Sequence, residues 1–113
     1  YPAIDDESVA LEPRARAYLA VNCAQCHQPG GGAPTALDLR FDVASADMNV
    51  FDVDPGSGDL GVTDARIVAP GDRDRSVLWL RMAGLGTERM PPIGSHVVDE
   101  TGVDLIGRWI DSL

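Results

Sequence analysis

Cys23-Ala24-Gln25-Cys26-His27 is the stretch around which the chain is organised. It places two thiols three positions apart and an imidazole directly after the second thiol. This spacing is typical of covalent attachment of a c-type haem. Each cysteine then bonds one vinyl-derived carbon of the porphyrin, and the histidine binds the iron. The motif predicts one haem per chain, held by Cys23 and Cys26, with His27 as the proximal ligand.

Two other kinds of site also use closely spaced cysteines. A structural zinc ion usually takes four protein ligands, mostly Cys or His. Besides the motif, this chain offers only the distant His96. A thioredoxin-like redox pair is expected in a βαβ context, which the sequence does not show. Both alternatives stay open at this point, and covalent haem is the interpretation that uses all three residues of the motif.

Length and composition predict a single domain. The chain has 113 residues, of which 44% are hydrophobic, values ordinary for one globular domain spanning 1–113. No stretch approaches the roughly 18 apolar residues of a membrane span. The sequence begins at Tyr1, without a basic and then apolar leader. We therefore expect a mature or excised product.

The charge balance bears on the class of partner. The formal net charge is −9, and every cation is an arginine. Phosphate binding needs basic patches, so nucleic acid is excluded as a partner class, and an anionic membrane surface is disfavoured for the same reason. The charge suits long-range attraction of a basic partner. A surface that only keeps the protein soluble is the alternative.

A second motif lies far downstream, where Arg89-Met90-Pro91-Pro92 puts a thioether in a loop stiffened by prolines. Together with the C-x-x-C-H motif, it resembles the class I cytochrome c domain, from about residue 12 to the end. The resemblance implies an all-α fold of three to four main helices around one covalently bound haem c. It also implies that Met90 is the second axial ligand. In that family a proline carbonyl accepts a hydrogen bond from the proximal imidazole, and Pro34 is the candidate here.

Other residues compete with Met90 for the sixth position of the iron. Met48 lies in an acidic segment without clear pattern, and Met82 lies in a predicted helix, where a core position is expected. His96 follows Met90 by six positions and is a rival ligand. An open sixth position is the remaining alternative.

Three stretches carry helix signals. Helix-forming residues predict the first helix from about 13 to 25, with Pro13 in its first turn. The second is expected to start after Asp72 or Asp74 as N-cap and to end near Ala83.

The third predicted helix covers about 100–112, with Asp99 as its N-cap. Apolar residues recur there at helical spacing and predict one buried face, made of Val103, Ile106, Ile110 and Leu113.

The segment at about 38–66 is predicted to be irregular and acidic. It begins with a short alternating run that places Leu39 and Phe41 inward. Its turn-rich part carries Asp52, Asp54 and Asp59, which are oxygen ligands of the kind calcium prefers. The EF-hand pattern fails there, so a solvated acidic loop is the alternative interpretation.

The resemblance has further implications. The segment from Pro70 to Leu78, PGDRDRSVL, is similar to one in cytochrome c domains fused to, or secreted beside, larger periplasmic bacterial proteins. The resemblance therefore implies a periplasmic or extracellular location, and a redox protein or a fused dehydrogenase domain as partner.

These signals lead to one main functional hypothesis and one rival. His27 and Met90 together would saturate the iron, so the chain is expected to transfer single electrons rather than to act as an enzyme by itself. A peroxidase-like enzyme or a gas sensor would instead need an open or labile sixth position. Arg89, next to Met90, and the nearby His96 are the only polar groups that hint at it.

Overall fold

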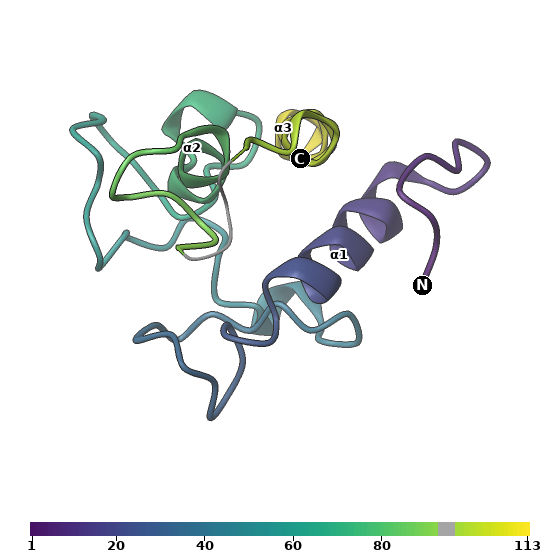
Figure 1. The fold of residues 1–113 in the computed structure, drawn as a ribbon, viewed down its shortest axis with the longest axis horizontal. Helices are drawn as coiled ribbons and strands as arrows, with labels where there is room; N and C mark the ends of the chain where they lie inside the picture. Colours follow the sequence, from purple (N-terminus) through teal and green to yellow (C-terminus); the bar gives the residue numbers. More distant parts are fainter. Residues whose placement is uncertain (93–96) are drawn as a thin grey trace. The chain divides into compact units, whose positions relative to one another are not determined.

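The computed structural model describes residues 1–92 and 97–113. Throughout these ranges the regular secondary structure is helical and no strand forms (Figure 1). This agrees with the predicted all-α class. The elements are the α-helices α1 (Leu11–Asn22), α2 (Val77–Ala83) and α3 (Glu100–Ser112) and the 3-10 turns η1 (Ser45–Asp47) and η2 (Arg73–Arg75).

The contacts divide the chain into an N-terminal unit, Tyr1–Asn49, and a C-terminal unit, Val50–Leu113. The N-terminal unit contains α1 and η1, and the C-terminal unit contains η2, α2 and α3. Within the described ranges, no helix is both long enough and apolar enough to cross a membrane.

Helix α1 begins and ends earlier than the predicted range of 13 to 25. It starts at Leu11, which makes Pro13 its third residue. Proline is tolerated there because the first N–H groups of a helix have no partner within it. The helix ends at Asn22, because the backbone turns at Cys23, where φ is −126°. The C-x-x-C-H motif therefore lies in a turn after the helix and not inside it.

A buried arginine ties α1 to the irregular segment of the same unit. The side chain of Arg16 is buried, and its Nη2 atom donates to the carbonyl oxygens of Arg40, Phe41 and Val43. Its Nη1 atom lies 3.4 Å from the hydroxyl of Ser45. Burying a cation costs free energy unless its donors are hydrogen-bonded, and here carbonyl oxygens accept from Nη2, whereas the buried Nε has no hydrogen-bond partner.

The irregular segment contains one short helical turn. The turn η1 covers Ser45–Asp47, and Met48 follows it with no exposed surface. The backbone N–H of Asp38 donates to the carbonyl of Met48 at 3.0 Å. Leu39 is buried as expected, whereas Phe41 is half-buried and stacks with Tyr1, with ring centroids 4.6 Å apart.

The predicted second helix is broken into two pieces by Ser76. Asp72 is the N-cap of η2, as its side chain accepts from the N–H of Asp74 at 3.0 Å. Ser76 then adopts an extended conformation and pairs in a single bridge with Arg66. Its buried hydroxyl donates to the carbonyl of Asp72 at 2.8 Å and accepts from the N–H of Ala69 at 2.9 Å. These contacts explain the break, because they hold Ser76 in an extended conformation against earlier residues of the same chain.

Helix α3 agrees closely with its predicted range. It covers Glu100–Ser112, and the side chain of Asp99 accepts from the N–H of Gly102 at 3.0 Å. Its buried face differs in part from the predicted one. Ile106 and Ile110 are buried as expected, but Val103 is half-buried and Leu113 is exposed. The other large buried side chains are Leu105 and Trp109.

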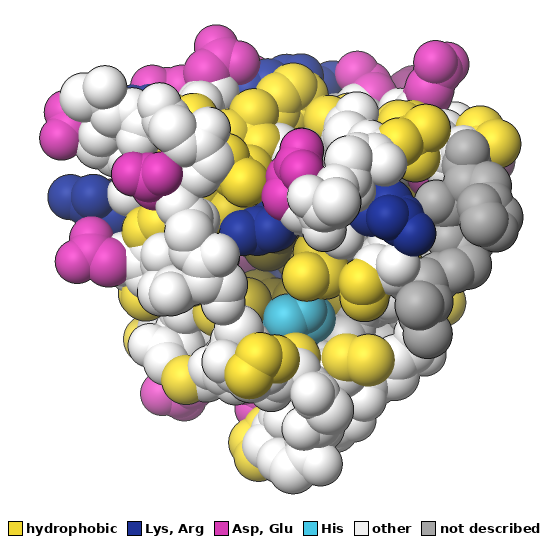
Figure 2. Space-filling view, turned by 60° about the vertical axis from the view of Figure 1, so that its left-hand side comes forward, with side chains coloured by type: hydrophobic (Ala, Val, Ile, Leu, Met, Phe, Trp, Pro, Cys, Tyr) yellow, Lys and Arg dark blue, Asp and Glu magenta, His cyan; other side chains and the backbone are white. Residues whose placement is uncertain are grey.

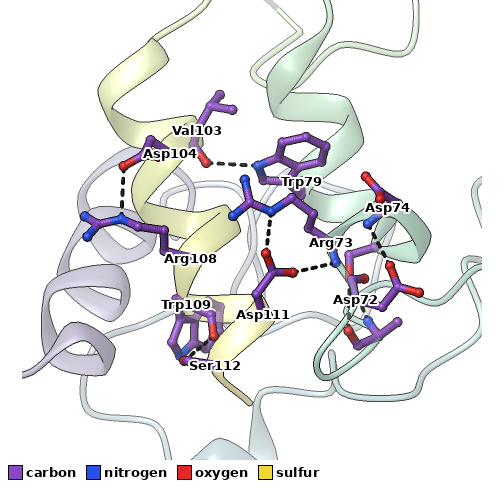
Figure 3. Close-up of polar contacts among 12 residues, drawn as sticks. Asp72, Arg73, Asp74, Trp79, Val103, Asp104, Arg108, Trp109, Asp111 and Ser112 are labelled. Atoms are coloured by element: carbon purple, nitrogen blue, oxygen red, sulfur yellow. Dashed lines mark hydrogen bonds and ion pairs between the residues drawn. The ribbon is translucent and has the colours of Figure 1, made fainter.

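Polar contacts join α3 to η2 and α2 within the C-terminal unit (Figure 3). The indole N–H of Trp79 donates to the carbonyl of Val103 at 2.9 Å. The guanidinium of Arg73 lies 5.3 Å from the centroid of the Trp79 ring, and its Nε donates to Asp111 at 2.7 Å. Gly107 leaves the room that these groups need, because a Cβ there would lie 2.5 Å from Arg73 Nη1 and 2.9 Å from Trp79 Nε1.

We predict that Gly107→Ala lowers the free energy of unfolding by about 1 kcal/mol. Overpacking costs about 1–3 kcal/mol, and the higher helix propensity of alanine offsets roughly 1 kcal/mol of that cost. Urea denaturation would measure the change. In an Arg73→Ala background the same substitution should cost less, because the guanidinium is gone and only the indole of Trp79 still crowds the new methyl group. An equal loss in both backgrounds would show that Arg73 does not cause the crowding.

The pair between Arg73 and Asp111 should make stability depend on pH. The hydrogen bonds from Arg73 hold the pKa of Asp111 below its usual value. The ionised carboxylate therefore stabilises the fold above the unfolded pKa of about 3.9, and this contribution disappears as pH falls further. We expect Asp111→Asn to lose less stability than the original chain between pH 7 and pH 3. Asp104→Asn, which removes the same charge from the same helix, is the control, and an identical response from all three chains would refute the prediction.

Candidate functional site

The C-x-x-C-H motif forms a tight turn directly after α1. The N–H of Cys23 still donates to the carbonyl of Leu19 at 2.9 Å. The N–H groups of Cys26 and His27 then both donate to the carbonyl of Cys23, at 3.1 and 3.0 Å. Three polar atoms, two sulfurs and one ring nitrogen, are thereby gathered at the end of one helix by the backbone alone.

The two thiols of the motif differ in environment. Both are free, with Cys23 half-buried and Cys26 exposed. Burial and the nearby Cys26 raise the pKa of Cys23 to about 11. A catalytic dithiol instead needs at least one thiol with a lowered pKa. Cys23 therefore does not have the lowered pKa that such a thiol needs.

The loop after the motif folds back onto it. Gly31 approaches so closely that a Cβ on this residue would lie 2.3 Å from the carbonyl oxygen of Cys26. That same carbonyl accepts from the N–H of Ala33 at 3.2 Å. The N–H of Leu39 donates to the carbonyl of His27 at 2.9 Å. The glycine-rich sequence thus lets the loop run against the motif, where any side chain at residue 31 would collide with the backbone.

His27 has a hydrogen-bond partner that the sequence did not predict. Its Nδ1 atom lies 3.0 Å from the hydroxyl oxygen of Thr35. Pro34, whose carbonyl was expected to accept a hydrogen bond from this imidazole, is the residue directly before Thr35, and its role stays a prediction. The partner at Nδ1 leaves Nε2 as the ring nitrogen available to a metal. Only the three-dimensional path of the loop could identify Thr35, because a lone threonine eight positions away carries no sequence signal.

The imidazole of His27 is half-buried and reaches the surface (cyan in Figure 2). Burial lowers its pKa below the usual value. The ring is therefore favoured in its neutral form near neutral pH, which is the form that binds a metal.

Met90 lies in the C-terminal unit, in the loop after α2. The residue is 37% exposed. Its N–H donates to the carbonyl of Arg81 at 3.0 Å. The guanidinium of Arg81 in turn donates to the carbonyls of Glu88, at 2.9 Å, and Ser57, at 3.1 Å. One arginine thus braces the loop through both its backbone and its side chain.

The rival iron ligands differ in their surroundings. Met48 has no exposed surface and fills the interior. Met82 is half-buried in α2. His96 lies outside the described residues. The structure gathers Cys23, Cys26 and His27 into one turn of the N-terminal unit.

The acidic loop that was weighed for calcium is held by local contacts. Asp54 forms an ion pair with Arg66 at 3.3 Å, and the side chain of Asp59 accepts from the N–H of Gly61 at 2.9 Å. Among residues 1–92 and 97–113, no three His, Cys, Asp or Glu side chains are grouped so as to hold a metal ion.

The described residues fit a covalently attached haem. The donor set comprises one exposed thiol, a second thiol three positions before it and a neutral imidazole whose Nε2 is available. Gly31, which has no side chain, lies against the carbonyl of Cys26. Cys23 and Cys26 would hold the group, and His27 would bind its iron.

We predict that iodoacetamide alkylates Cys26 faster than Cys23 in chain produced without haem. Burial and a raised pKa both reduce the thiolate fraction of Cys23, and the thiolate is the reactive form. Peptide mass spectrometry after a short exposure would measure the two rates. In denaturant the difference should largely vanish, and equal rates in native buffer would contradict the described geometry.

No family model, curated protein or solved structure matches this chain. We therefore infer its function from the geometry of the motif and from the chemistry of the residues around it.

Proposed function

We propose that this chain is a class I cytochrome c domain that transfers single electrons. It would carry one haem c attached through Cys23 and Cys26, with His27 and Met90 as axial ligands. The observation that carries the proposal is the C-x-x-C-H turn with its imidazole oriented by Thr35 at 3.0 Å. When bound, the haem supplies a reversible one-electron couple between ferric and ferrous iron.

The residues of the N-terminal unit would anchor and orient the group. Two thioether bonds fix it to the turn after α1, so its position follows that of the backbone. The bond at Nδ1 fixes the tautomer of His27 and directs Nε2 to the metal. Because burial lowers the pKa of this imidazole, protons compete less with the iron for it.

Met90 would complete the coordination. A thioether is a soft donor, and His/Met ligation raises the reduction potential. The exposure of Met90 and the bracing of its loop by Arg81 support this role. The burial of Met48 supports Met90 over that rival. A saturated iron leaves no position for a substrate, so electron transfer is favoured over catalysis.

The surface charge supports a basic redox partner. Acidic and basic side chains are interspersed on the face drawn in Figure 2. Many of the basic groups are neutralised locally, because several arginines in the described ranges pair with aspartates: Arg40, Arg66, Arg73, Arg75 and Arg108. The net charge of −9 is therefore carried by acidic groups in excess. A periplasmic or extracellular redox protein, or a fused dehydrogenase domain, is the proposed exchange partner.

Optical spectroscopy with and without carbon monoxide tests the proposal. The purified chain should show a low-spin reduced spectrum, a methionine–iron charge-transfer band when oxidised, and indifference to carbon monoxide. Met90→Leu should abolish the band, admit carbon monoxide and lower the reduction potential, since leucine keeps the volume but lacks sulfur. Met82→Leu is the matched control and should change none of these properties.

Two outcomes would overturn parts of this proposal. A high-spin spectrum, or ready binding of carbon monoxide by the original chain, would show an open sixth position and favour an enzyme or a gas sensor. A chain without covalent haem after expression with the haem-attachment machinery would refute the cofactor itself. Cys26→Ala should reduce covalent haem content, and full double attachment in that variant would also refute it.

A further inference from the structure

We infer that Thr35 is the positioning residue for the proximal imidazole and that it tunes the reduction potential through its hydroxyl group. This inference rests on the proposed function. It assigns to a side chain the role that the sequence gave to the carbonyl of Pro34. The contact that carries it is the 3.0 Å distance between His27 Nδ1 and Thr35 Oγ1.

The backbone holds Thr35 in place from both sides. Before it, the N–H of Ala33 donates to the carbonyl of Cys26, and after it, the N–H of Leu39 donates to the carbonyl of His27. Both acceptors belong to the C-x-x-C-H motif itself. The hydroxyl therefore belongs to a loop that is hydrogen-bonded twice to the backbone of the motif, so its position is tied to that of His27.

The chemistry of the hydroxyl differs from that of a carbonyl in one useful respect. A carbonyl only accepts, whereas a threonine hydroxyl accepts and donates. It can therefore bond Nδ1 in either tautomer of a free imidazole. Metal binding at Nε2 requires the proton at Nδ1, so His27 then donates and Thr35 accepts. This bond increases the electron donation of the ring to the metal.

The sign of the effect on the reduction potential follows from this arrangement, in which His27 donates and Thr35 accepts. Stronger donation by the imidazole stabilises ferric iron more than ferrous iron, which lowers the reduction potential. Loss of the Thr35 hydroxyl should therefore raise the potential. A change of such an outer contact typically alters metal affinity about tenfold or more. A tenfold change in the ratio of ferric to ferrous affinity equals about 59 mV for one electron.

The test compares Thr35→Val and Thr35→Ser in the haem-loaded chain. Valine keeps the branched shape without the hydroxyl, and serine restores the hydroxyl. We expect Thr35→Val to raise the reduction potential by up to about 59 mV, the tenfold ratio above, and Thr35→Ser to restore it. In the diamagnetic ferrous protein, NMR should show that the Nδ1–H proton of His27 exchanges with water at least about tenfold faster in Thr35→Val than in the original chain or Thr35→Ser. Thr63→Val, at an exposed threonine of the C-terminal unit, is the control.

Each outcome decides between the two proposals. Equal potentials and equal exchange rates in the original chain and Thr35→Val would overturn the role of Thr35 while leaving electron transfer intact. A chain that takes up no covalent haem would overturn the proposed function, and this inference with it. If Thr35→Val does not accumulate, Thr35→Ala removes the same hydroxyl and is expected to give the same two changes.

Discussion

The carbonyl of Cys26 lies where a side chain of residue 31 would begin, and the candidate site depends on that exclusion. Because residue 31 is glycine, the following loop can pass close enough for Ala33 to bond this same carbonyl. Loop closure then places Thr35 beside the ring of His27. The end of α1, the C-x-x-C-H turn and the loop after it are thus held together by a backbone contact, in which no side chain of the motif takes part.

In the C-terminal unit, too, a glycine makes room for a contact that a side chain would block. There the missing side chain of Gly107 leaves space for a guanidinium and an indole, and α3 is joined to η2 and α2 through them. The loop of Met90 is supported in a third way, by hydrogen bonds to and from Arg81. The residues of both motifs are thus positioned by neighbours that carry no distinctive sequence signal. Packing and hydrogen bonding, more than local propensity, fix the geometry of both motifs.

The sequence was informative where the signal is local. The range of α3, with Asp99 as its cap, follows from patterns within a few residues. The end of α1 and the break at Ser76 were predicted wrongly: the backbone turns at Cys23 in the first case, and a contact distant in sequence decides the second. Ser76 leaves the helix since its backbone pairs with Arg66, ten residues earlier.

The residues of the candidate site also divide into those with a local sequence signal and those that only the folded chain identifies. The C-x-x-C-H spacing directly predicts Cys23, Cys26 and His27 as site residues, whereas Thr35 and Arg16 have no sequence signal at all. Both act on partners brought near only by the folded loop between residues 28 and 45. A residue that orients another through a single hydroxyl, or that satisfies carbonyls of a distant loop, can be found only after the chain is folded.

The buried Arg16 has a consequence for how the protein resists acid. An arginine side chain stays protonated at any pH at which proteins fold, and its acceptors are neutral carbonyls. Nothing in that contact can titrate. The contact between Arg73 and Asp111, by contrast, includes a carboxylate that gains a proton in acid. As the medium is acidified, the ion pair that joins η2 to α3 therefore weakens, whereas the contacts of Arg16 with the carbonyls of residues 40–43 keep their acceptors.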